Sequence, residues 1–78
     1  MITVIIPFLN EERALPATLG ALFANDLPME VIAVDAGSTD GSREVLRRYS
    51  RIRVIIADRG RAEQMNAGAR QARGNLLL

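Results

Sequence analysis

The segment from Glu30 to Ser42 constrains the fold of this chain more than any other. It begins with the apolar run Val-Ile-Ala-Val, which ends abruptly at Asp35 and is followed by Ala-Gly-Ser-Thr-Asp-Gly. The residues after this turn have the spacing of an amphipathic helix. The pattern predicts a buried strand that presents a carboxylate at its carboxyl end, which is where open α/β sheets bind their ligands.

The rest of the chain continues this alternation. Helix-like spacing occurs at 12–25, 40–49 and 62–72, and apolar runs that predict strands occur at 2–7, 30–35, 52–57 and 75–78. Pro16 fits the first helix only within its first turn, where its missing N–H costs nothing. Strands that alternate with helices through short connections imply right-handed crossovers and a parallel sheet. We therefore predict an α/β fold with a Rossmann-like, three-layer parallel sheet and helices on both faces.

Composition excludes several kinds of chemistry. The chain contains no Cys and no His, which rules out disulfides, thiol nucleophiles and Ser-His-Asp catalysis within it. A bound metal would need oxygen ligands, which favours Mg²⁺ or Mn²⁺. A net charge of +1 gives no electrostatic case for nucleic acid. The apolar start is too short for a transmembrane segment and lacks the features of a signal peptide, so we expect a cytoplasmic protein.

Polar residues follow the first two strands, and their loops meet at one edge of a parallel sheet. Asn10, Glu11 and Asp35 can accept hydrogen bonds from a base or from ribose hydroxyls. Gly37 allows a left-handed backbone or the close approach of a ligand. Each has a structural alternative: residues 10–12 can cap the first helix, Asp35 can have a purely structural role, and residues 38–40 can be turn and cap chemistry only.

The third loop adds two arginines, Arg59 and Arg61, which can meet a pyrophosphate in the forked geometry of guanidinium. The N-terminus of the helix after Arg61 adds N–H groups. The alternative is that both arginines face solvent. On this helix we expect Met65 in the core, and Asn66 either lining a site or on the surface. No Gly-x-Gly-x-x-Gly or Walker-type motif occurs, which argues against dinucleotide and P-loop sites.

Three segments resemble the opening of the family-2 glycosyltransferases, in order and in spacing. They are Val4-Ile-Ile-Pro7-Phe-Leu-Asn10-Glu11-Glu12, then Glu30-Val-Ile-Ala-Val-Asp35-Ala-Gly-Ser-Thr-Asp-Gly, then Gly60-Arg-Ala-Glu-Gln-Met-Asn66-Ala-Gly68 with Ala72-Arg-Gly74-Asn. The resemblance implies a GT-A fold with strand order 3-2-1-4, of which residues 1–78 form the first, nucleotide-sugar-binding portion. It also implies sugar transfer from a UDP- or GDP-linked donor, with Mg²⁺ or Mn²⁺ on the pyrophosphate.

The resemblance assigns roles by position. It implies that Pro7, Asn10 and Glu11 line the nucleoside pocket and that Asp35 lies against the base or ribose. Arg61 and Asn66 are implied on the donor side, and Gly37 completes the expected nucleotide-binding set. Many members carry two consecutive acids after the second strand, the second of which typically contacts the base. Here that position is Ala36, so the usual base contact is missing.

The catalytic parts implied by the family are expected outside this chain. Its metal-binding Asp-x-Asp follows the fourth strand, beyond Leu78, and its catalytic base comes from the later half. We therefore expect no catalytic or metal-binding residue within these residues, and no transferase activity from them alone. The apolar run up to Leu78 suggests the first part of a larger domain; a natural small protein with a short edge strand is the alternative.

Two other functions fit the same residues. One is a nucleotide-binding module that turns nothing over. The other is a purely structural fragment that self-associates through its exposed fourth strand, because an open strand edge invites pairing.

Overall fold

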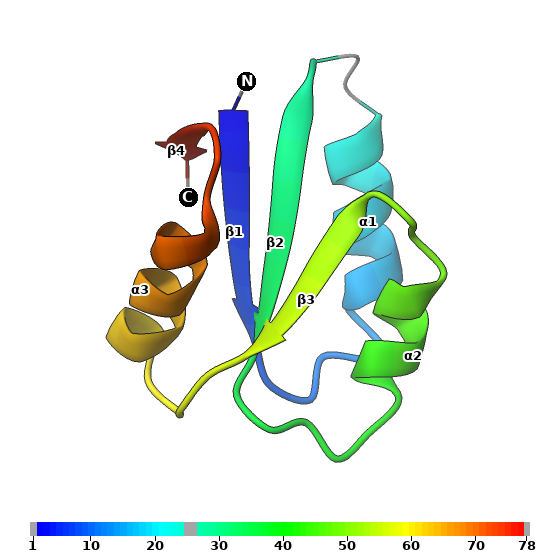
Figure 1. The fold of residues 1–78 in the computed structure, drawn as a ribbon. Coiled ribbons are helices and arrows are strands. Elements are labelled where there is room, and N and C mark those ends of the chain that lie inside the picture. The colour runs from blue at the N-terminus through cyan, green and yellow to red at the C-terminus, as the bar shows by residue number, and fades with distance from the viewer. Residues whose placement is uncertain (1, 25–26, 78) are drawn as a thin grey trace.

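The computed structural model describes residues 2–24 and 27–77. Strands and helices alternate along the chain (Figure 1), in the order β1 (Ile2–Phe8), α1 (Leu15–Phe23), β2 (Met29–Asp35), α2 (Ser42–Arg47), β3 (Ile52–Ile56), α3 (Arg61–Gln71) and β4 (Asn75–Leu77). The predicted α/β fold with parallel strands is confirmed. Two predicted end residues, Asn25 of the first helix and Leu78 of the last strand, lie outside the described residues.

The sheet has the order β3-β2-β1-β4, and its paired strands are parallel. Strands β1 and β2 pair along their whole length, with Phe8 opposite Asp35, and β3 continues the row with Ile56 opposite Asp35. Within the described residues, strand β4 pairs with the first part of β1, from Ile2 to Val4. The carboxyl ends of β1, β2 and β3 therefore meet at one edge of the sheet, and the loops that follow them lie side by side.

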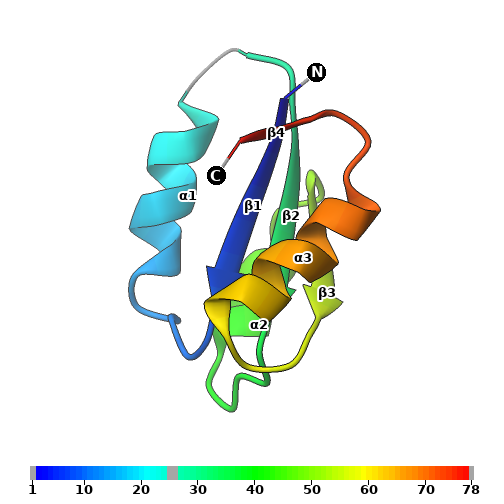
Figure 2. The same ribbon diagram turned by 90° about the vertical axis from the view of Figure 1, so that its left-hand side faces the viewer.

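Helices cover both faces of the sheet, α1 and α2 on one and α3 on the other (Figures 1 and 2). The two-residue period of a strand divides β2 between the faces. Ala33 packs with Leu19 of α1 and Leu46 of α2, and full burial of a leucine contributes roughly 2 kcal/mol. The alternate residues Ile32 and Val34 pack on the other face with α3, where Met65 is half-buried as predicted.

Helix α3 lies close to β1 because of one glycine. A Cβ atom at Gly68 would lie 2.6 Å from Cγ2 of Ile5, so a side chain there would push the helix away from the sheet. The close approach brings the start of α3 to the edge at which β1 and β2 end. It thereby places the third loop beside the first two.

Some predicted ends were wrong, for local reasons. Helix α1 begins at Leu15 and not at residue 12, because the Glu11 carbonyl accepts the N–H groups of Ala14 and Leu15 in a preceding turn. Pro16 does lie in the first turn of the helix, as predicted. Helix α2 spans only Ser42–Arg47 of the predicted 40–49, since residues before it form hydrogen bonds with the first loop.

Strand β1 runs through Pro7 to Phe8, one residue beyond its predicted end. The carbonyl of Phe8 accepts the N–H of Ala36 on the β2 side. Because successive strand residues point their backbone groups to opposite sides, the backbone of Pro7 faces the β4 side. Among the described residues, β4 pairs with β1 as far as Val4, so the missing N–H of Pro7 breaks no ladder hydrogen bond within this part of the chain.

Candidate functional site

The loops after β1 and β2 are joined to each other at the carboxyl edge of the sheet. Five hydrogen bonds cross between residues 10–12 and residues 38–42: Asn10 N to Ser38 Oγ (2.9 Å), Thr39 N to Asn10 Oδ1 (2.8 Å), Glu11 N to Ser42 Oγ (2.9 Å), Glu12 N to Asp40 Oδ2 (3.2 Å) and Gly41 N to Glu12 Oε1 (2.8 Å). Helix α1 has no side-chain cap. Residues 10–12 therefore fix the second loop, and the alternative that their side chains cap the first helix is wrong.

The side chain of Asp35 is completely buried at the end of β2. Its carboxylate accepts hydrogen bonds from the N–H groups of Gly37 (3.0 Å) and Ser38 (2.8 Å) and pairs with Nε of Arg43 on α2. Burial raises the pKa of Asp35, but the hydrogen bonds from Arg43, Ser38 and Gly37 outweigh it and leave the pKa below its ordinary value. The Asp35 carboxylate therefore stabilises the conformation of the loop that follows it.

Asn10 and Glu11 differ in whether their side-chain oxygens remain available to a ligand. Asn10 has a left-handed backbone (φ 52°), which an asparagine tolerates, and its side-chain oxygen is used by Thr39. The exposed carboxylate of Glu11 has no hydrogen-bond partner among the described residues. Both residues line a hollow of ≈ 340 Å³ with Glu12, Arg13, Ala14 and Asp40. Glu11 is therefore the acid of the first loop that a ligand can reach.

Pro7 and Gly37 act through the backbone. Pro7 is half-buried within β1, opposite Val34. Gly37 has φ 101°, and a Cβ there would meet nothing within 4 Å. The glycine is thus required for the backbone conformation of the turn and not for lack of space.

The second loop also uses its remaining polar residues internally. Asp40 accepts hydrogen bonds from the N–H and Oγ of Ser42, at 2.9 and 2.5 Å. The Ser42 side chain lowers the pKa of Asp40 most, and burial opposes it only partly. The contact of Asp40 with Ser42 is local turn chemistry, but residues 38–40 also bond to the first loop and α2 has no side-chain cap, so turn and cap chemistry alone does not describe them.

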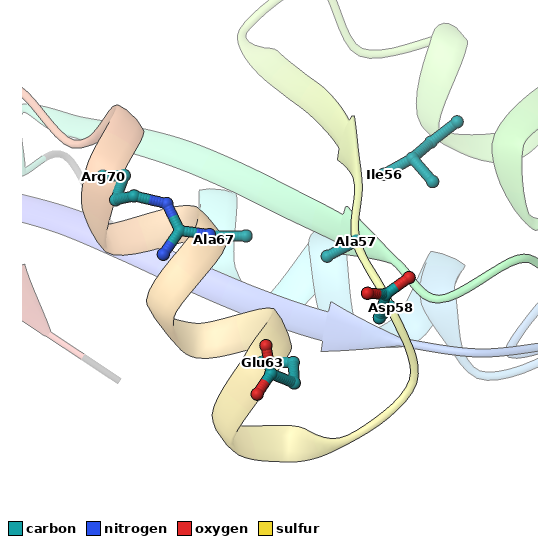
Figure 3. Close-up of a pocket in the computed structure, with 6 residues that line it drawn as sticks. All are labelled: Ile56, Ala57, Asp58, Glu63, Ala67 and Arg70. Carbon is teal, nitrogen blue, oxygen red and sulfur yellow. The ribbon is translucent and has the colours of Figure 1, made fainter.

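The third loop presents charged side chains for which the described residues provide no hydrogen-bond or ion-pair partner. Asp58, Arg59 and Arg61 are exposed, and Gly60 takes φ 123° immediately before α3. Beside this loop a hollow of ≈ 330 Å³ opens between the end of β3 and α3 (Figure 3); it is lined by Ile56, Ala57, Asp58, Glu63, Ala67 and Arg70. Its two carboxylates and one guanidinium can hydrogen-bond a polar ligand.

The structure brings only part of the predicted set together. Asn10 and Glu11 share one hollow, whereas Asp35 lies inside the protein. Arg61 and Asn66 are exposed on α3 but are not among the residues that line either hollow. The seven predicted residues, all within the described part of the chain, thus do not line a single hollow.

Two residues that organise this edge were missed. Gln64 is buried, and its Nε2 donates to the carbonyls of Phe8 (3.1 Å) and Val34 (3.0 Å) at the ends of β1 and β2. Its spacing of four residues from Gly68 places it on the inward face of α3, which was the available signal. Arg43 is the second: it pairs with the buried Asp35, and the signal was that a buried acid requires a cation.

Residues 2–24 and 27–77 contain no group of three or more His, Cys, Asp or Glu side chains that could hold a metal ion. The donor set present therefore does not fit Mg²⁺ or Mn²⁺, and we derive no step through a metal. Within the same part of the chain, no helix is long and apolar enough to cross a membrane.

A parallel α/β sheet with interlocked polar loops at its carboxyl edge defines a class: proteins that bind ligands, nucleotides among them, beyond the ends of their strands. The model of the family "Glycosyl transferase family 2" matches residues 3–78. The chain therefore belongs to glycosyltransferase family 2, as the resemblance of its motifs predicted.

Individual relatives agree with this membership. Glycosyltransferase AglE of Haloferax volcanii is 33% identical over 97% of this chain and 28% of its own length. The crystal structure of S. aureus TarS 1-349 superposes with a TM-score of 0.89 at 28% identity, covering 97% of this chain and 26% of that one. Another crystal structure of TarS 1-349 holds UDP.

A third relative carries both a donor and a metal. Mannosyltransferase PcManGT from Pyrobaculum calidifontis, solved in complex with GDP-Man and Mn²⁺, has a TM-score of 0.81 at 30% identity, over 91% of this chain and 24% of its own. The chain thus spans about a quarter of the length of these relatives. Their fold over the shared part is the fold described above.

Proposed function

We propose that these residues form the donor-nucleotide part of a family-2 glycosyltransferase that transfers a sugar from a UDP- or GDP-linked donor to an acceptor. The observation that carries the proposal is the interlocked pair of loops, which leaves the Glu11 carboxylate free at the ligand edge. Complexes of two structural relatives with UDP and with GDP-Man support a nucleotide there.

In this proposal Pro7, Asn10 and Glu11 form one wall of the nucleoside site. The Glu11 carboxylate accepts hydrogen bonds from ribose hydroxyls or a base N–H, and Gly37 lets the second loop approach the ligand. Asp35 acts as a positioning residue for that loop, which its burial and its bonds to Gly37 and Ser38 support.

Arg61 and Asn66 extend the proposed site toward the diphosphate and the sugar. Arg61 opens α3, where free helical N–H groups and a guanidinium both favour an anion. Mg²⁺ or Mn²⁺ would neutralise charge on the leaving diphosphate. We propose that its ligands, and the catalytic base, belong to the rest of a longer catalytic domain, since the chain spans about a quarter of its relatives' length.

The test is calorimetric titration of the chain with UDP, GDP and, as a control, inorganic phosphate, each with and without Mn²⁺. We expect weak nucleoside-diphosphate binding that is independent of Mn²⁺. Glu11→Gln should weaken it roughly tenfold, because a hydrogen bond to a charged group is worth about 1.5 kcal/mol. Glu44→Gln, which changes an exposed acid of α2, should leave it unchanged.

Three outcomes would count against the proposal. Binding of neither nucleotide would favour a structural role for the chain. Sugar transfer from a labelled donor by these residues alone would show that they hold catalytic groups that the proposal places elsewhere. Nucleotide binding without any transfer in a longer protein that contains them would favour a non-catalytic binding module.

A further inference from the structure

Strand β3 forms an open edge of the sheet. Its only ladder partner among the described strands is β2. The N–H of Ala57 donates to the carbonyl of Asp35, on the β2 side, at 2.9 Å. Because strand residues alternate, the backbone groups of Val54 and Ile56 point away from β2. This edge therefore offers unpaired N–H and C=O groups to an added strand.

The side chains beside this edge are apolar and unusually exposed. Val54 and Ile56 are 36% and 65% exposed, and both project to the side of the sheet that carries α2. They line a surface hollow of ≈ 260 Å³ together with Arg43 and Arg47 of α2. We call these four residues the β3 groove.

The charge around the β3 groove is positive. Its lining includes two arginines and no acid. Arg43 already pairs with the buried Asp35. Arg47 pairs with Glu44 across solvent, where both side chains are about two-thirds exposed, and such a pair contributes little. Arg48 and Arg51 are also exposed, and the five arginines of residues 43–53 outnumber the three acids that pair with them, Glu30, Asp35 and Glu44. A ligand of this groove should be anionic.

We propose that the β3 groove binds an extended acidic segment of a partner protein, which adds a strand to β3. Its backbone would pair with Val54 and Ile56, its apolar side chains would cover theirs, and flanking carboxylates would meet Arg43 and Arg47. This mode of recognition takes affinity from main-chain hydrogen bonds and specificity from alternate side chains. Such a segment would pair with the open backbone groups of β3, cover the exposed apolar side chains and neutralise the arginines.

Two other occupants fit less well. A second copy of this chain would bring the same arginines face to face, and its acids that flank an apolar run, Glu30 and Asp35, lie inside its own sheet. An anionic lipid surface would satisfy the arginines and the apolar side chains. It would leave the backbone groups of the edge without partners.

The test uses a fluorescent seven-residue peptide, Glu-Thr-Val-Thr-Val-Thr-Glu, whose glutamates and valines share one face of a strand. We expect anisotropy titrations to show saturable binding that weakens as salt is added. Arg47→Glu and Ile56→Lys should each weaken it at least tenfold. The matched variant Arg48→Glu, at an exposed position outside the groove, should bind within about twofold of the original chain, since rim charges have small effects on affinity.

Two control peptides test the mode of binding. Replacing both glutamates by lysine should abolish binding, and so should N-methylation of all five internal residues, which removes backbone N–H donors on both sides of the peptide whichever way it runs along β3. Failure of the parent peptide to bind, or equal binding of either control peptide, would overturn the proposal. Light scattering tests whether a second copy of the chain binds the β3 groove, and pelleting with anionic vesicles tests whether a lipid surface does. Dimerisation or vesicle binding that both Arg47→Glu and Ile56→Lys abolish would also overturn the proposal.

Discussion

Strand β2 carries an acid near each end, and the two acids are used differently. Within the described residues, the side-chain carboxylate of Asp35, at the carboxyl end, bonds only to groups within eight residues of itself: Gly37, Ser38 and Arg43. Glu30, near the amino end, joins segments that are far apart in the chain; it accepts hydrogen bonds from Thr3 Oγ1 (2.9 Å), Arg53 Nη1 (3.2 Å) and the N–H of Arg73 (2.7 Å).

The difference separates the two edges of the sheet by function. At the carboxyl edge, the Asp35 carboxylate fixes the shape of one loop through local contacts, which suits the ligand site that we propose there. At the amino edge, Glu30 ties β1, β3 and the connection into β4 together, and Thr3 reinforces the tie by accepting the N–H of Gly74 at 3.0 Å. The proposed ligand site and the long-range contacts of Glu30 thus lie at opposite ends of one strand.

The largest expected effect comes from removing the buried acid. Asp35→Ala would leave the Arg43 guanidinium without its buried partner, and we expect it to lower the free energy of unfolding by about 3 kcal/mol. Urea denaturation followed by circular dichroism measures this. Asp58→Ala, at an exposed acid of the third loop, should change it by less than about 0.5 kcal/mol. Equal effects of the two variants would show that Asp35 does not organise its edge.

A smaller effect is expected from the side chain that ties α3 to the same edge. Gln64→Leu keeps the volume but removes the donor shared by the carbonyls of Phe8 and Val34, which should cost about 2 kcal/mol. The same denaturation experiment measures it, with Glu63→Gln on the exposed face of α3 as the control. A Gln64→Leu variant as stable as that control would mean that α3 does not hold this edge.

The amino-acid sequence predicted what depends on local pattern. Apolar runs and helical spacing give the strands, the helices and their alternation, because the periods of the two structures differ. The order of the three motifs along the chain predicted the family. Helix ends were less predictable: residues 10–12 have the composition of a helix cap, but their hydrogen bonds go to the second loop, about 28 residues away.

The sequence predicted where the candidate site lies, but not which contacts each of its residues makes. It indicated a ligand contact for Asp35, because this acid ends a buried strand. Whether it meets a ligand or an internal cation depends on Arg43, whose position relative to Asp35 is set by the turn between them. Gln64 was missed because a polar residue on a helix is usually exposed, and only the fold shows two carbonyls within its reach.

Acid should weaken the fold through both acids of β2. Burial raises the pKa of Asp35, but its hydrogen bonds, that of Arg43 first, lower it more. The N–H of Arg73 lowers the pKa of Glu30 most, and burial opposes it only partly. A folded-state pKa below the unfolded value gives stability that is present above the unfolded pKa and is lost as pH falls through the folded pKa. The loss should therefore develop below the unfolded values of 3.8 for Asp35 and 4.5 for Glu30.

The measurement is the urea midpoint from pH 7 to pH 2.5. Protonation leaves each carboxyl group in place as a neutral hydrogen-bonding partner, so the loss should be smaller than that of Asp35→Ala. Asp35→Asn should flatten the part of the profile below pH 3.8, where Asp35 contributes. An unchanged profile in Asp35→Asn would assign the acid sensitivity to other groups.

The smallest expected effect, and the one that most sharpens the comparison of the two acids, comes from Glu30→Gln. Glutamine keeps the shape but removes the charge that holds Arg53 and the N–H of Arg73, so we expect a small loss of global stability with a local opening where the chain enters β4. Hydrogen exchange followed by NMR should be several-fold faster at the amides of Arg73 and Gly74, because local openings need less free energy than global unfolding. The amides of Gly37 and Ser38 serve as the internal control, since the Asp35 carboxylate that accepts their hydrogen bonds is untouched. Faster exchange at those two amides as well would show that the edges are coupled, and that the division of roles along β2 is wrong.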